Sequence, residues 1–379
     1  MAERTTRRRF LATCATAFCA ASAASLCGSP RPAPAQRPTR GLVKARLSPY
    51  FTPLPGGDIR CDLCPRHCRV APGQRGRCRV RENRGGRYFS LVYGNPCALH
   101  PDPIEKKPFF HVLPGTTSYS VATAGCNIHC KFCQNWEISQ AAPEDLFNHD
   151  VPPDALVSRA RDAKARSVAY TYVEPTVFFE YMLDSAQAAR AAGLRNVYHS
   201  NGFISAAPLR ALTPVLDAAN IDLKAFNDTF YREHCQGELA PVLATLTALQ
   251  RAGVHLEITN LVIPTLNDDP SQIRDLCLWV RRELGPETPL HFSRFYPLYK
   301  LKNLPPTPVT ILERARATAL AIGLEYVYIG NVPGHEGENT FCPRCKRLLI
   351  ERSGFMVRGV HLQDGRCGAC GQPIPGIWA

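Results

Sequence analysis

Short apolar segments alternate with longer amphipathic segments between residues 117 and 332. The apolar segments are rich in β-branched and aromatic residues and mostly lack alternation, which is typical of strands buried on both faces. We expect strands at 117–123, 168–173, 196–199, 220–223, 255–262, 290–295 and 324–329. Helical periodicity predicts helices that include 176–192, 239–252, 270–284 and 309–322.

Boundary signals support these helices. Asn267, Asp268 and Asp269 supply N-capping side chains before the helix at 270–284. Repeated strand–helix units imply a parallel sheet, as a full or partial barrel or as an open doubly wound sheet. Glycines close the four helices at the expected C-terminal position: Gly193, Gly253, Gly285 and Gly323.

Composition and charge narrow the class of protein. The 379 residues are 45% hydrophobic and 20% charged, enough for a sizeable core and two or three structural units. The mean hydropathy of -0.17 argues against a multi-span membrane protein. The net charge of +13 would ordinarily suggest nucleic acid or an anionic membrane as a partner.

Residues 1–35 read as an export signal. Residues 6–11, Thr-Arg-Arg-Arg-Phe-Leu, resemble the twin-arginine (Tat) motif, and Ala33-Pro34-Ala35 supplies a cleavage pattern after an apolar stretch. That stretch is too short for a membrane anchor, so we expect no span in the mature chain. Removal of five arginines and one glutamate lowers the net charge from +13 to +9. We expect a periplasmic or exported protein, with a cytoplasmic location as the alternative.

The 17 cysteines are too many, and odd in number, for a simple disulfide framework. Three leave with the signal, and Cys97, Cys235 and Cys277 stand alone. Residues 30–58, rich in Pro, Arg and Gly, read as a linker. We expect a linker and N-terminal module at 36–112, a central domain at 113–335 and a C-terminal module at 336–379. The remaining cysteines form three groups: Cys61, Cys64, Cys68 and Cys78; Cys126, Cys130 and Cys133; Cys342, Cys345, Cys367 and Cys370.

The middle group lies on one short loop after the first expected strand. Three thiolates on such a loop suit a [4Fe–4S] cluster with one iron left open. A zinc loop that lacks its fourth ligand, or simply buried thiols, are the alternatives. The segment Gly125–Cys133, with Phe132 at the aromatic position, resembles the Cys-x3-Cys-x-aromatic-Cys signature of radical S-adenosylmethionine (SAM) enzymes.

The resemblance implies an α/β fold with a partial (β/α)6-type TIM barrel, an N-terminal Cys-rich module and a C-terminal zinc-ribbon-like module. It implies a [4Fe–4S] cluster on Cys126, Cys130 and Cys133 as the catalytic centre. SAM would bind the open iron and yield a 5′-deoxyadenosyl radical that abstracts hydrogen from an unidentified substrate, with a protein as the candidate. A low-potential electron donor is implied as well.

Polar residues follow successive strands, where barrel active sites lie. Residues 172–175, Tyr-Val-Glu-Pro, resemble the family's Gly-Gly-Glu-Pro segment without its glycines. A lysine can pair with the methionine carboxylate, and an aspartate can accept ribose hydroxyls. Tyr296 and Asn331 complete the rim. The expected cofactor-binding residues are Phe132, Glu174, Ser200, Asn201, Asp222, Lys224 and Arg294.

The two flanking cysteine groups suggest further metal sites. The N-terminal group fits Zn²⁺ or a second iron–sulfur cluster, with disulfides as the alternative. The C-terminal group, two Cys-x2-Cys knuckles, predicts a structural zinc site, with two local disulfides as the alternative.

The whole order of motifs resembles the radical SAM enzymes of the AmmeMemoRadiSam system, which are related to pyruvate formate-lyase activating enzymes. The match includes Glu105-Lys106-Lys107-Pro108 and 330–334, Gly-Asn-Val-Pro-Gly. Residues 294–297, Arg-Phe-Tyr-Pro, stand where activases carry a histidine. The family implies a protein partner. The alternatives are a non-catalytic multi-cluster electron carrier and a zinc-ribbon nucleic-acid binder; nucleic acid is the weaker, since much of the positive charge lies beside thiols.

Overall fold

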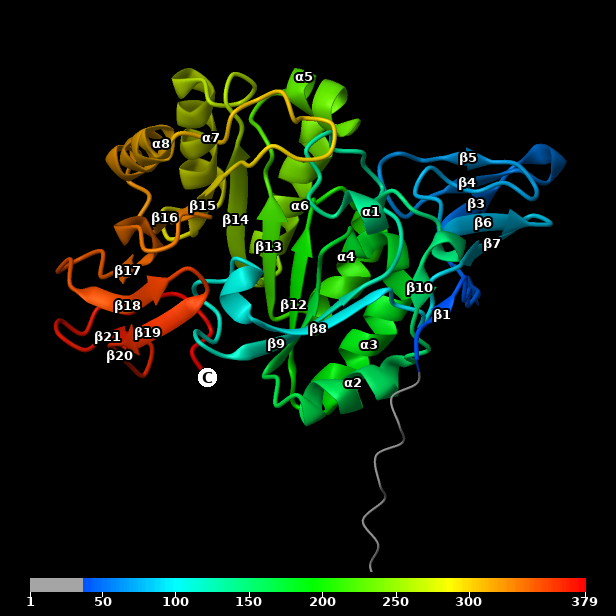
Figure 1. Cartoon of the computed structure of the whole chain (residues 1–379), viewed down its shortest axis with the longest axis horizontal. Helices are drawn as coiled ribbons and strands as arrows, with labels where there is room; N and C mark the ends of the chain where they lie inside the picture. The colour runs from blue at the N-terminus through cyan, green and yellow to red at the C-terminus, as the bar shows by residue number, and fades with distance from the viewer. Residues whose placement is uncertain (1–36) are drawn as a thin grey trace, which may run out of the picture. The chain divides into compact units, whose positions relative to one another are not determined.

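The computed structural model describes residues 37–379; the expected export signal lies in residues 1–36, outside the described part. Within residues 37–379, every helix is too short or too polar to cross a membrane. The fold is mixed α/β and is built on one eight-stranded sheet (Figure 1).

Seven strands of this sheet run parallel and follow one another in chain order, as repeated strand–helix units require. All seven expected strands are present, with ends shifted by a few residues. Strands β8 and β16 are the two edges, so the hydrogen-bonded ladder stays open. The parallel strands are β9 (Thr117–Ala122), β11 (Ser167–Tyr170), β12 (Arg195–Ser200), β13 (Ala218–Asp222), β14 (His255–Val262), β15 (Leu290–Arg294) and β16 (Val327–Gly330).

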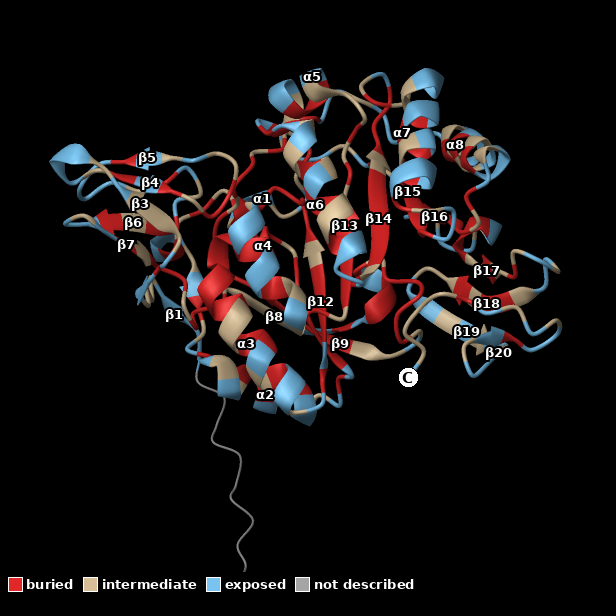
Figure 2. Cartoon of the chain, turned by 180° about the vertical axis from the view of Figure 1, so that it is seen from behind, coloured by how far each residue is buried: buried red, intermediate tan, exposed pale blue. Residues whose placement is uncertain are grey.

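Helices pack on one face of this sheet, and α3, α4 and α6 lie in front of the strands in Figure 2. Asp269 caps α7 as expected, since its carboxylate accepts hydrogen bonds from the backbone N–H groups of Ser271 and Gln272. The helices are α1 (Trp136–Ser139), α2 (Pro153–Asp162), α3 (Phe179–Ala191), α4 (Ala206–Leu212), α5 (Asp228–Phe230), α6 (Leu239–Arg251), α7 (Pro270–Glu283) and α8 (Val309–Ile322).

The other face of the sheet is covered by the chain segment before β9. Ile104, Phe109 and Val112 pack there against Ala169 and Val197. Strand β8 (Ala98–Pro103) pairs antiparallel with β9 and is absent from the predicted strands. Its two prolines obscure the pattern, and they are tolerated because β8 is an edge strand.

The N-terminal part consists of short antiparallel strands. Residues 37–58 belong to the segment predicted as a linker, yet they contain three of these strands, which are too short to leave a periodic pattern. This part is fixed to α3 by the buried guanidinium of Arg81, which pairs with the Glu180 carboxylate at 2.5 Å. The strands are β1 (Thr39–Arg40), β2 (Arg46–Leu47), β3 (Phe51–Pro53), β4 (Ile59–Cys61), β5 (Arg69–Val70), β6 (Arg81–Arg84) and β7 (Arg87–Ser90), with β1 on β10 (Phe147–Asn148).

The C-terminal part packs beside β16. Buried Arg352 donates to the Phe110 carbonyl at 2.6 Å and to Thr340, and the Tyr328 hydroxyl lies 3.0 Å from Thr340. These contacts join the last strands to the central sheet. They are β17 (Thr340–Phe341), β18 (Leu348–Ser353), β19 (Met356–Val360), β20 (Leu362–Gln363) and β21 (Arg366–Cys367).

The Arg81–Glu180 pair gives a stability prediction. Glu180→Gln leaves the Arg81 charge buried without a counter-ion, so we expect the free energy of unfolding to fall by about 3–5 kcal/mol. Glu283→Gln, which breaks the exposed pair with Arg282, is the matched control and should change it by less than about 1 kcal/mol. Denaturant titration measures both. If the two variants changed the free energy of unfolding equally, the buried Arg81–Glu180 pair would not stabilise the fold more than an exposed pair does.

Candidate active site

A cavity of about 450 Å³ lies at the carboxyl ends of the parallel strands. Three groups of residues meet there: the three cysteines of the loop after β9, polar residues that follow β11 to β13, and the segment Glu105–Pro108. Of the ten residues predicted for the catalytic centre and SAM, nine line the cavity: Cys126, Cys130, Cys133, Phe132, Glu174, Ser200, Asn201, Asp222 and Lys224.

The cysteine loop is held from two sides. Gly125 has a φ of 92°, and a Cβ there would lie 2.5 Å from the Cys78 carbonyl oxygen, so only glycine fits. On the other side, the π-helical turn Tyr231–Cys235 accepts hydrogen bonds from His129 and Lys131 backbone N–H groups through its carbonyls. The loop is therefore a fixed platform. No motif or spacing in the sequence indicates this second contact.

Cys235 supports the cysteine loop from outside the cavity, a contact that the sequence pattern missed. Its fully buried thiol lies beside Cys130, and this contact, together with burial, raises the pKa of Cys130 well above its ordinary value. Cys235 stood alone in the sequence, 102 residues after Cys133, so no spacing pointed to it.

The sulfur positions in the loop fit a cluster better than a single ion. Among residues 37–379, three or more His, Cys, Asp or Glu ligand atoms all lie within 4.8 Å of one another in the C-terminal group alone. Cys126, Cys130 and Cys133 face one cavity but are spread more widely. A four-iron cluster requires such spreading because each thiolate binds a different iron.

Glu174 follows β11, and its carboxylate is hydrogen-bonded to residues at the end of β12. One of its oxygens, Oε1, accepts hydrogen bonds from the Thr176 N–H and hydroxyl at 3.0 and 2.6 Å. The other, Oε2, accepts from the Asn201 N–H at 2.8 Å and shares the Ser200 hydroxyl with Oε1. Complete burial raises the pKa of Glu174 against these hydrogen bonds, which lower it. Oε2 can accept one more donor.

A second polar cluster follows β13. The Lys224 ammonium donates to Asp222 Oδ2 at 2.7 Å, and His199 Nε2 lies 3.3 Å from Asp222 Oδ1. Although burial raises it, the pKa of Asp222 ends well below its ordinary 3.8 because of the Lys224 ammonium and the hydrogen bond with His199. The resulting stabilisation is present above pH 3.8 and is lost as the pH falls through the lowered pKa of Asp222. Asp222 and Lys224 are therefore both charged at neutral pH. His199 is a site residue that sequence reasoning placed only in a strand.

The tenth predicted residue, Arg294, does not line the cavity. Its guanidinium donates to the Thr307 carbonyl at 2.9 Å and lies over the Tyr296 ring at 5.1 Å. Asn331, by contrast, lines the cavity and donates to the Arg294 carbonyl at 3.1 Å. A cofactor role for Arg294 stays a prediction.

Tyr172 stands where the family's Gly-Gly-Glu-Pro segment has its first glycine. It adopts a φ of 65°, a left-handed conformation that glycine takes without strain. The surrounding contacts hold it there: its hydroxyl donates to Asp102, the Lys107 ammonium lies 4.3 Å from its ring centre, and Asn135 donates to its carbonyl at 2.7 Å. The segment Glu105–Pro108 thus supports the cavity wall.

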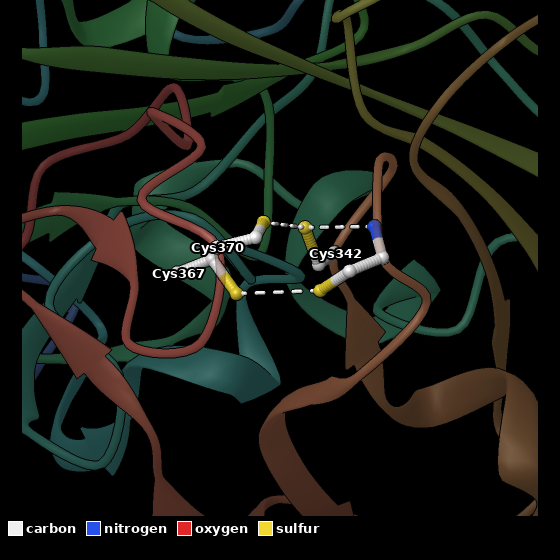
Figure 3. A group of neighbouring side chains, drawn as sticks. Cys342, Cys367 and Cys370 are labelled. Atoms are coloured by element: carbon white, nitrogen blue, oxygen red, sulfur yellow. Dashed lines mark hydrogen bonds between the residues drawn. The ribbon is translucent and has the colours of Figure 1, made fainter.

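The C-terminal thiols form a compact group. The sulfur atoms of Cys342 and Cys370 lie 3.6 Å apart, as do those of Cys345 and Cys367, and Figure 3 shows Cys342 and Cys370 facing one another. Hydrogen bonds from the backbone N–H groups of Ala369 and Cys370 lower the pKa of Cys367 to about 6, which favours a metal-binding thiolate. This arrangement can hold one metal ion or a cluster.

The N-terminal thiols, Cys61, Cys64, Cys68 and Cys78, also meet, around a separate cavity of about 20 Å³. Cys97 does not line that cavity. All fourteen cysteines of residues 37–379 are free thiols, so the disulfide alternatives have no counterpart in the described structure.

Comparison with known proteins agrees with this geometry. The radical SAM superfamily model matches residues 120–277. An uncharacterised protein of Methanocaldococcus jannaschii is 47% identical over 331 residues, which are 87% of this chain and 98% of that protein. The pyruvate formate-lyase-activating enzyme of Listeria monocytogenes is 24% identical over 172 residues, 42% of this chain and 67% of the enzyme.

Among solved structures, a radical SAM methyltransferase from Sphaerobacter thermophilus is 14% identical, with a TM-score of 0.44 over 76% of this chain and 81% of its own. The family model, the full-length relative and the three cysteines at the strand ends agree, and this chain belongs to the radical SAM superfamily.

Proposed function

We propose that this protein is a radical SAM enzyme that holds a [4Fe–4S] cluster on Cys126, Cys130 and Cys133 and cleaves SAM reductively. The observation that carries the proposal is the meeting of the three thiols with Glu174, Asp222 and Lys224 in one cavity. When bound, the cluster and SAM supply a 5′-deoxyadenosyl radical that removes a hydrogen atom from the substrate. The parallel order of β9 to β16, with two unpaired edges, supports a partial barrel around this site.

The side chains of the cavity have separable tasks. Glu174 Oε2 has capacity for one more donor, which the methionine ammonium of SAM would provide. Lys224 pairs with Asp222 and is placed to attract the methionine carboxylate, while each Asp222 oxygen, with one partner already, can accept a further hydrogen bond from a ribose hydroxyl. Ser200 and Asn201 hold Glu174 in position, and Asn201 Nδ2 lies 3.8 Å from the Cys126 sulfur. An electron carrier or scaffold would have no use for this constellation.

We propose a protein or peptide as the substrate. The cavity extends from the cysteine loop to Gly354 and Phe355, in the turn between β18 and β19. Phe355 is 49% exposed and the adjacent Met356 is 66% exposed, so apolar surface suited to a polypeptide lies at and beside this end of the cavity. The motif order supports membership of the AmmeMemoRadiSam group, and the Arg-Phe-Tyr-Pro segment argues against glycyl-radical activation as the reaction.

The proposal predicts SAM cleavage. Anaerobically purified, cluster-loaded protein reduced with dithionite should release 5′-deoxyadenosine, measured by chromatography. Cys130→Ala should abolish release because it removes a ligand of the cluster. Cys277→Ala, in α7, should retain it.

Wild-type protein that carries its cluster yet forms no 5′-deoxyadenosine would sink the proposed reaction. Product formation without a mass change in any candidate partner protein would count against a polypeptide substrate alone.

The Lys224 ammonium is expected to contribute binding free energy for SAM. Lys224→Met removes a hydrogen bond between charged groups, which is worth about 1.5–3 kcal/mol, so affinity should fall about tenfold or more. Equilibrium dialysis with radiolabelled SAM measures this, with iron content as the check on the cluster. Lys302→Met changes an exposed lysine outside the cavity and serves as the control. Wild-type affinity in Lys224→Met would remove Lys224 from the binding site.

We propose zinc for the C-terminal group. Bonds of about 2.3 Å from zinc to four thiolates place neighbouring sulfurs about 3.8 Å apart, close to the 3.6 Å found here. The protein should contain about one zinc per chain, and Cys345→Ser should lose it and lower the Tm. Metal analysis and thermal melting test this. Stoichiometric iron and sulfide at these cysteines would contradict it.

A further inference from the structure

We infer that Cys61, Cys64, Cys68 and Cys78 hold a second iron–sulfur cluster, which passes electrons from an acidic donor protein at a basic face to the Cys126 loop. This inference rests on the proposed function, because reductive cleavage of SAM requires one electron. It concerns a part of the molecule outside the cavity described above.

The spacing of the four thiols separates a cluster from zinc. Four thiolates around one zinc ion nearly touch, as in the C-terminal group, and leave no space between them. The N-terminal thiols are spread too widely for all four sulfurs to lie within 4.8 Å, and they surround a cavity of about 20 Å³. The same protein thus contains a zinc-sized thiol group and a wider one.

The surroundings suit an anionic cluster. Backbone N–H groups of Leu63, Arg66 and Val80 point at the thiols of Cys61, Cys64 and Cys78. Arg66 and Arg81 line the same cavity, and Arg66, which unlike Arg81 has no carboxylate partner among the described residues, can offset negative charge. Tyr88 also lines it, with its hydroxyl buried beside Cys61.

The four-thiol cavity touches the loop that holds the first cluster. Asn127, the neighbour of Cys126, lines it, and Arg66 donates to the Asn127 carbonyl at 2.9 Å. Cys78 lies against Gly125, where a Cβ would come within 2.5 Å of the Cys78 carbonyl oxygen. Two contacts therefore join the two cysteine groups directly, which is the arrangement that electron transfer between clusters needs.

The outer side of this module is basic. Arg77 and Arg79 flank Cys78 and, with Lys300, line an open hollow of about 750 Å³. These three side chains have no carboxylate within salt-bridge distance among the described residues, and none of the residues that line the hollow is acidic. Gly76 borders both the hollow and the four-thiol cavity. A small acidic iron–sulfur or flavin protein fits this face by charge.

The redox step is balanced. The reduced donor loses one electron to the N-terminal site, which returns to its oxidised state as that electron moves to the cluster at the Cys126 loop. That cluster then gives one electron to each SAM molecule cleaved. No further reductant is required.

Metal content tests the site independently of SAM cleavage. The wild type should carry about eight iron and eight sulfide ions per chain, four of each per cluster. The triple variant Cys126→Ala/Cys130→Ala/Cys133→Ala should keep about four of each, and Cys61→Ser/Cys64→Ser should do the same with the other cluster. The fully reduced wild type should show spin–spin broadening in its EPR spectrum that both variants lack.

Extra zinc in place of iron in the triple variant, or no metal beyond the C-terminal ion, would overturn the second cluster. If the triple variant holds four iron ions but the wild type does not cleave SAM, the second cluster is supported and only the proposed function is contradicted. If one variant does not fold, the other still reports the iron count.

The basic face is tested by stopped-flow reduction with an acidic ferredoxin as the probe. Arg77→Glu/Arg79→Glu should slow cluster reduction about tenfold or more at low salt, whereas the exposed Arg251→Glu on α6 should not. An unchanged reduction rate in the double variant would overturn the docking face. The docking face would also be overturned if the wild type bound RNA in a salt-dependent way and the double variant lost RNA binding but kept its reduction rate.

Discussion

The contact between Gly125 and the backbone of Cys78 constrains the site from outside the sheet. It allows the cysteine loop to lie directly on the N-terminal strands, because any side chain at position 125 would overlap the Cys78 carbonyl. The π-helical turn at Tyr231–Cys235 fixes the same loop from the opposite side. Three thiols are thereby held above the strand ends before any metal arrives, which reduces the ordering that metal binding must impose.

The other functional groups of the cavity lie at the ends of the strands. Glu174 links β11 to β12 through hydrogen bonds to Ser200 and Asn201, and Asp222 joins Lys224 to His199. One carboxylate is buried among neutral donors and the other lies against the Lys224 ammonium, so the two differ in pKa although both face one cavity. Glu174 can therefore accept a hydrogen bond from an ammonium group of a ligand. The Asp222–Lys224 pair can bind a ligand's carboxylate through the lysine and its hydroxyls through the aspartate.

Much of this was predictable from the sequence, for physical reasons. Buried parallel strands leave continuous apolar runs, so all seven were found, and thiols closely spaced on a loop reveal a metal site. Edge strands with prolines, such as β8, and two-residue strands leave no such pattern. His199 joins the cavity, and Cys235 reaches Cys130, only through tertiary contact. The spread of the thiols from Cys61 to Cys78 is likewise invisible in their spacing, so zinc and iron could not be separated there.

The central claim is that SAM binds through its methionine end to a cluster on Cys126, Cys130 and Cys133. Electron–nuclear double resonance of the reduced, cluster-loaded protein with SAM labelled with ¹⁵N in the amino group and ¹⁷O in the carboxylate tests it most directly. Hyperfine coupling of both labels to the cluster is the predicted result. A reduced cluster whose spectrum is unchanged by saturating labelled SAM would contradict the account.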